Sequence, residues 1–150
     1  MRLSALVITA LVALTGCSDT FEERFSSMND VKAQGMVARG WIPSGLPAGT
    51  EVVVRWNIDT NMVRGRMSVS TDQLPSPGKS LTVPEADLRL PFHGRGSVTP
   101  NWWPRELSPP GPTGELRAAG WDLFIVQGER SGYVAVRRAE SRLYFWSEGS

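Results

Sequence analysis

The single histidine is the strongest candidate for acid–base chemistry in this sequence. His93 lies in the stretch PFHGRG, and histidine is the side chain whose ordinary pKa is nearest to neutral pH. In a hydrolase it would act as a general base, oriented by Asp72, Glu85 or Asp87, with a serine as nucleophile. No nucleophile-elbow pattern accompanies it, so a surface-loop histidine is the favoured interpretation. We therefore predict a non-enzymatic protein without catalytic residues, and a small hydrolase using His93 is a remote alternative.

Two short motifs fit ion-binding loops only in part. The glycines of GRG at 94–96 would present backbone N–H groups to an anion, but so short a motif is weak evidence. The stretch DTNMVRG begins like a calcium loop with Asp59 and Asn61, yet Val63 and Arg64 stand where a ligand and a glycine are needed. One cysteine and one histidine leave little to hold zinc. The sequence predicts no metal site and no cofactor.

Two adjacent tryptophans, Trp102 and Trp103, stand before a proline in the stretch NWWPREL. If exposed, this pair would form an aromatic platform for a glycan, a lipid headgroup or a protein. If buried, the pair would fill a core that has few helices to cover it, and this is the favoured interpretation. A ligand-binding module for glycan or lipid that uses Trp102 and Trp103 is therefore kept as an alternative function.

Length and charge restrict the classes of protein to consider. The chain has 150 residues, which favours one domain, and its 16 basic and 15 acidic side chains nearly cancel. This balance provides no strong positive field, and we predict no nucleic-acid partner. The single cysteine, Cys17, excludes a disulfide within the chain.

The position of Cys17 indicates where the protein is located. It follows an apolar run at 3–14 that is shorter than the roughly 20 residues of a membrane-spanning helix and fits a secretory signal peptide. Leu14-Thr15-Gly16-Cys17 resembles the lipobox of bacterial lipoprotein precursors. The resemblance implies cleavage before Cys17 and attachment of acyl chains, such as palmitate, to its sulfur and amino group. Membrane lipid would then be a partner through Cys17.

The resemblance also implies a location and a division of the chain. Ser18, rather than an aspartate, follows the cysteine, and this favours the periplasmic leaflet of the outer membrane over the inner membrane. Residues 1–16 would be the signal peptide and residues 17–26 a lipidated tether. Residues 27–150 would form a single small globular domain.

The hydrophobic pattern predicts a β-rich α+β fold. Ser27 or Asn29 would cap a short helix that continues to about Arg39. Alternating apolar residues predict a hairpin at 52–69, and short apolar runs separated by turn-forming residues predict a three-strand antiparallel meander at 121–147. Most of the prolines fall between these units, where we expect a long irregular segment laid over the sheet, with short edge strands at 81–83 and 87–90.

A second resemblance spans most of the chain after Cys17. The motifs RGWIPSGLP, NIDTN, NWWPREL and YVAVRRAESRLYFW occur in this order. Together they are similar to a group of small uncharacterised proteobacterial lipoproteins, from which no activity carries over. We therefore expect a membrane-anchored lipoprotein of the cell envelope, acting as a non-enzymatic interaction or support protein, with another envelope protein as a possible partner.

Overall fold

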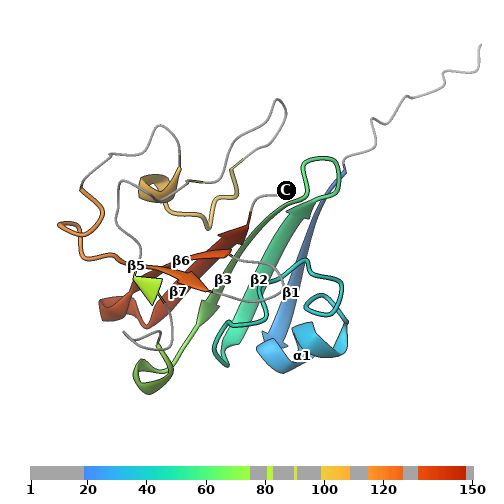
Figure 1. Ribbon diagram of the computed structural model, residues 1–150, viewed down its shortest axis with the longest axis horizontal. Helices are drawn as coiled ribbons and strands as arrows, with labels where there is room; N and C mark the ends of the chain where they lie inside the picture. The colour runs from blue at the N-terminus through green and yellow to red at the C-terminus, as the bar shows by residue number, and fades with distance from the viewer. Residues whose placement is uncertain are drawn as a thin grey trace, which may run out of the picture.

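The computed structural model describes residues 19–74, 81–82, 90, 99–108, 115–126 and 132–147. Within these ranges the chain forms one seven-stranded sheet whose neighbouring strands are antiparallel (Figure 1). Across the sheet the strands follow the order β1-β2-β3-β7-β6-β5-β4. Their bounds are β1 (Thr20–Ser27), β2 (Thr50–Asn57), β3 (Met62–Ser68), β4 (Leu81–Thr82), β5 (Asp122–Val126), β6 (Gly132–Arg137) and β7 (Arg142–Ser147).

The sheet consists of two antiparallel units that meet between β3 and β7. Strands β1, β2 and β3 follow one another along the chain, and the chain then crosses to the opposite edge, where β4 pairs with β5. Strands β5, β6 and β7 return as a meander, which places β7 beside β3. The predicted hairpin and meander are both present. The edge strand predicted at 81–83 is present as β4, whereas residues 83–89 lie outside the described part of the chain.

The prediction of an α+β fold is wrong, because the described residues contain little helix. They include one α-helix of six residues, α1 (Met28–Ala33). The other helical segments are three short 3-10 turns, η1 (Thr71–Gln73), η3 (Arg105–Leu107) and η4 (Arg138–Glu140). The fold is therefore β-rich, and no helix in this part of the chain has the length and apolar character needed to cross a membrane.

Local sequence accounts for both ends of α1. At its start, the Ser27 side chain accepts a hydrogen bond from the Asp30 backbone N–H, and the Asp30 carboxylate accepts one from the Ser27 N–H. At its end, Gly35 adopts a φ of +73°, and its N–H donates to the Lys32 carbonyl while the next N–H donates to that of Val31. This is the Schellman motif. The helix therefore stops well before Arg39, where the sequence predicts its end.

Strand β1 replaces most of the predicted tether. Residues from Thr20 onward pair with β2, beginning with Thr20 opposite Asn57 and ending with Ser27 opposite Thr50. The segment contains Glu22, Glu23 and Arg24, and such charges are common on edge strands, where they discourage pairing with other chains. The described sheet therefore begins at Thr20, before the predicted start of the domain at residue 27. The sequence did not reveal this because a polar edge strand and a polar tether have similar residues.

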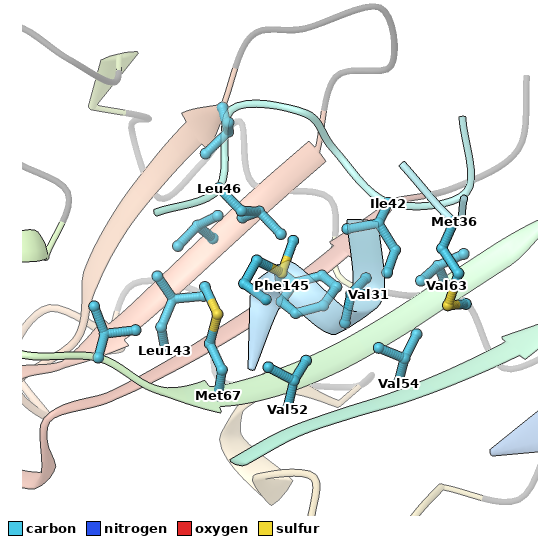
Figure 2. Close-up of a cluster of buried hydrophobic side chains, with 14 of the residues drawn as sticks. Val31, Met36, Ile42, Leu46, Val52, Val54, Val63, Met67, Leu143 and Phe145 are labelled. Atoms are coloured by element: carbon cyan, nitrogen blue, oxygen red, sulfur yellow. The ribbon is translucent and has the colours of Figure 1, made fainter. Parts of the chain in front are cut away.

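One face of the sheet is covered by α1 and the segment that follows it. Val31, Met36, Ile42 and Leu46 pack there against apolar side chains of β2, β3 and β7 (Figure 2). Phe145 lies near the centre of this cluster and has no exposed area. The bulk of its ring is accommodated by the absence of a side chain at the neighbouring residue of β3, Gly65.

The opposite face is covered by the segments at 99–108 and 115–121, which lie on the other side of the sheet from α1 (Figure 1). Aromatic side chains dominate this second cluster. Trp103 meets Tyr144 and Trp146 edge to face, with ring centroids 5.8 and 5.9 Å apart, and Trp121 meets Tyr144 at 5.6 Å. The predicted irregular covering layer is thus present in the described residues, and aromatic packing holds it on the sheet.

Candidate functional site

Strand alternation gathers basic side chains on the face of the sheet opposite α1. Arg64 and Arg66 stand two residues apart on β3, and their register partners extend the same face into the neighbouring strands. Arg66 is opposite Val53, which is opposite Arg24 on β1. We call this surface the arginine face; its arginines on the described strands are Arg24, Arg55, Arg64, Arg66, Arg137 and Arg142.

The predicted platform residues, Trp102 and Trp103, cover part of the arginine face. The guanidinium of Arg64 lies 5.8 Å from the ring centroid of Trp103, and that of Arg66 lies 5.7 Å from the ring centroid of Trp102. The exposed fractions of the two tryptophans are 9% and 4%. Both indoles are thus buried in the covering layer and do not form an exposed aromatic pair.

Hydrogen bonds hold these indoles in place. The Nε1–H group of Trp102 donates to a carboxylate oxygen of Glu22 at 3.1 Å. That of Trp103 donates to the Leu107 carbonyl at 3.1 Å. The bond from Trp102 to β1 joins segments 80 residues apart and fixes the covering layer above the first strands of the sheet.

A cleft of about 520 Å³ lies beside this covered region. Three of its lining arginines come from three different strands: Arg24 from β1, Arg66 from β3 and Arg142 from β7. The remaining lining residues are Phe25, Glu51, Val52 and Val53. We call this feature the arginine cleft.

A β-bulge brings one carboxylate to the arginine cleft. Between the register pairs of Thr50 with Ser68 and Val53 with Arg66, β2 has one residue more than β3. Glu51 lies at this bulge with a φ of +51°, a conformation that non-glycine residues seldom adopt. Its carboxylate accepts a hydrogen bond of 2.7 Å from the Ser68 hydroxyl. The strained backbone of Glu51 thus occurs at the residue whose carboxylate lines the cleft, and Glu51 is the one acidic residue in that lining.

Burial and neighbouring positive charges disfavour the charged forms of two arginines on the arginine face, Arg64 and Arg66. Burial lowers the pKa of Arg64 to about 10, with a further contribution from the charge of Arg55. Burial also lowers the pKa of Arg66, and the charges of Arg142 and Arg24 act in the same direction. The buried Nε of Arg66 has no hydrogen-bond partner in the described part of the chain. Arg66 is therefore held next to like charges with an unused donor.

Other residues singled out from the sequence do not form a site in the described structure. His93, Glu85, Asp87 and the GRG motif lie outside the described residues, as does Cys17. Asp72 is exposed in η1. No group of three or more metal-ligating side chains occurs within the described ranges.

The start of β1 lies beside the turn that joins β2 and β3 (Figure 1). The Ile58 N–H donates to the Asp19 carbonyl at 3.0 Å. The carboxyl group of Asp59 shares a hydrogen bond with that of Asp19, and this bond, with the repulsion between the two groups, raises the pKa of Asp59. Ile58 and Phe21 are the large apolar residues exposed among those described, at 57% and 44%. Asp19, which follows Cys17 by two residues in the sequence, thus lies at this end of the sheet.

The fold and its cleft define a β-sheet domain with a cluster of basic side chains on one face. Residues 19–68 match the family model of the YbbD head domain, a family of bacterial envelope proteins. The match covers a third of the chain and spans β1, α1, β2 and β3, including two arginines of the cleft, Arg24 and Arg66. No curated protein and no solved structure matches the chain significantly. The match agrees with the expected envelope class, while the lipobox and its lipid stay predictions.

Sequence reasoning did not find the arginine cleft. The alternation of Arg64 and Arg66 with apolar residues predicts a hairpin with one polar face, and from the sequence alone such a face is expected to lie in solvent. Arg24 lies in the predicted tether and Arg142 lies in the distant meander. The available signal was the pair of arginines spaced by two on β3, but it does not indicate which other cations would join them.

Proposed function

We propose that this protein is a membrane-anchored lipoprotein of the bacterial envelope and that its sheet domain is a non-enzymatic interaction domain. The observation that carries the proposal is the position of the family match. It begins at residue 19, directly after the Cys17-Ser18 pair at which the lipobox resemblance predicts the mature chain to start. A match to an envelope family and a lipid-attachment motif thus adjoin one another in the chain.

The start of β1 supports a close attachment to the membrane. Two residues separate Cys17 from Thr20, and an extended chain spans about 3.5 Å per residue. A lipid on Cys17 would therefore hold the first strand near the bilayer surface. The exposed side chains of Phe21 and Ile58 lie at this end of the sheet and would face the lipid.

A permanent attachment requires more than one acyl chain. Each buried methylene contributes about 0.8 kcal/mol, and a single chain gives only marginal binding. The two or three chains that the lipoprotein resemblance implies for Cys17 would make the attachment effectively irreversible. By the same resemblance, Ser18 favours the periplasmic leaflet of the outer membrane.

Metabolic labelling with a fatty-acid probe tests the anchor. We expect the wild-type chain to incorporate the probe and to sediment with membranes, and Cys17→Ala to do neither. Ser18→Ala serves as the matched control, because it alters the adjacent residue and keeps the thiol. Equal labelling of wild type and Cys17→Ala would overturn the lipoprotein assignment.

Proximity crosslinking in the native envelope tests the interaction role. Wild-type protein should recover a specific envelope neighbour, and Cys17→Ala should lose it because the domain would no longer be held at the membrane. If both chains recover the same proteins in equal amounts, the proposed envelope partner has no support.

A further inference from the structure

We propose that the arginine cleft binds a phosphate monoester. Arg24, Arg66 and Arg142 reach one cleft of about 520 Å³ from three strands. A guanidinium group presents a planar set of donors that matches phosphate oxygens in a bidentate arrangement. This inference does not depend on lipid attachment at Cys17, because the cleft belongs to the folded sheet.

The charge of the cleft indicates which anion fits. Its lining holds three arginines and one acidic residue, Glu51, which leaves two positive charges. Outside the lining, the carboxylate of Glu22 lies 3.8 Å from both Arg24 and Arg55, so the charges of Glu22 and Arg55 add nothing to this sum. A phosphate monoester carries about 1.5 to 2 negative charges at neutral pH. It therefore neutralises the cleft, whereas a phosphodiester or a single carboxylate carries one charge.

The cleft holds its cations in an arrangement that a bound anion would stabilise. Arg66 is close enough to Arg142 and Arg24 for both to disfavour its charge, and its buried Nε–H has no acceptor in the described structure. Leaving a buried donor unsatisfied and like charges together destabilises a fold. A phosphate oxygen in the cleft would supply the missing acceptor and oppose the repulsion.

Arg66 and Arg24 differ in how strongly neighbouring side chains restrain them, and this difference suggests how a ligand enters the cleft. The indole of Trp102 lies against Arg66 and restrains it, with 5.7 Å between guanidinium carbon and ring centroid. Arg24 is exposed over 69% of its side chain and makes a long contact of 3.8 Å with Glu22. Because exposed pairs of this kind are weak, Arg24 can turn from Glu22 to an incoming anion.

The source of the phosphate is a separate question from its chemistry. Arg24 is four residues along β1 from Thr20, a distance of about 13 Å at 3.3 Å per residue. Arg142 is opposite Ser68 at the other end of the strands. The cleft is thus set back from the end of the sheet at which β1 starts, and this favours a soluble monoester over the phosphodiester headgroup of a membrane lipid.

Titration calorimetry on the full chain in nonionic detergent tests the site. The probes are inorganic phosphate, glycerol 3-phosphate and glycerophosphoglycerol, each against sodium chloride of equal ionic strength. We expect saturable binding of the first two, with glycerophosphoglycerol at least about tenfold weaker because it carries one charge. Arg66→Gln and Arg142→Gln should each weaken binding about tenfold or more, the usual effect of losing a charge-assisted hydrogen bond.

Two further variants keep the test independent of folding. Arg24→Gln changes an exposed residue, so it should weaken binding about threefold while the chain keeps its unfolding temperature in chloride. Arg39→Gln removes the same charge from the opposite side of the sheet, where Arg39 stacks on Trp41, and should bind phosphate like wild type. The proposal is overturned if wild type shows no saturable phosphate binding, if glycerophosphoglycerol binds more tightly than glycerol 3-phosphate, or if Arg39→Gln weakens binding as much as Arg66→Gln.

Discussion

Gly65 offers a sharp test of how the two halves of the sheet are joined. It lies in β3, opposite Val54 of β2 and Phe145 of β7. A Cβ built on Gly65 would lie 2.5 Å from Cε1 and 2.6 Å from Cε2 of the Phe145 ring and still closer to Cζ, where ordinary contacts begin at 3.4 Å. The substitution Gly65→Ala must therefore displace a ring that has no exposed area.

The expected loss of stability combines two opposing effects. Overpacking a well-filled core costs about 1–3 kcal/mol, and the complete burial of Phe145 places this case near 3 kcal/mol. Alanine in a strand regains about 0.5–1 kcal/mol over glycine through backbone entropy. We therefore expect Gly65→Ala to lower the free energy of unfolding by about 2 kcal/mol. Urea unfolding followed by tryptophan fluorescence measures this difference.

A double-mutant comparison isolates the contact with Phe145. In a Phe145→Leu background the ring is absent, so adding Gly65→Ala should cost less than about 1 kcal/mol. If Gly65→Ala costs the same in both backgrounds, or less than about 0.5 kcal/mol in wild type, the reasoning about this contact is refuted.

Two other predictions concern local contacts. Ser27→Ala removes the cap of α1 and should lower the free energy of unfolding by about 1 kcal/mol, while Ser26→Ala, an exposed neighbour on β1, should change it little; equal effects in a urea titration would contradict the capping role. The pKa of Glu106 is lowered from its ordinary 4.5, first by a backbone hydrogen bond and then by Arg137, against the effect of its partial burial. Its carboxylate thus stabilises the fold above about pH 4.5, and this contribution is lost as pH falls through the lowered pKa. Glu106→Gln should flatten that acid dependence of stability, and an unchanged pH profile would exclude the contact.

The hairpin and the meander were predictable because their signal is local. Alternation of apolar and polar residues marks β2 and β3 directly in the sequence, while β6 and β7 are short apolar runs bounded by turn-forming residues. The start of α1 was predictable to within two residues, with Ser27 or Asn29 as its cap, and the structure selects Ser27, which forms a capping box with Asp30. The end of the helix was misjudged because a glycine inside a helical pattern and a C-terminal stop look the same until the backbone is seen.

The edge strand β1 could not be distinguished from a tether by its residues. Its charged side chains suit either state, and only the hydrogen bonds to β2 decide between them. The same holds for the burial of Trp102 and Trp103, because an indole pair in a loop is suited to a core or to a surface. What lies beneath the loop, here the stacked side chains of Arg64 and Arg66, determined the outcome.

The sequence by itself determined which residues of β2 and β3 share a face, that α1 starts at Ser27 or Asn29, and that the lone Cys17 stands in a lipobox-like motif. Only the tertiary structure decided that Arg24, Arg66 and Arg142 surround one cleft. The physical reason is that side-chain alternation acts over a short range of sequence, whereas strand pairing joins residues far apart. Side-chain alternation is a property of a few adjacent residues, whereas the cleft depends on β7 pairing with β3 across more than seventy residues of chain, and this register is set by the packing of both cores.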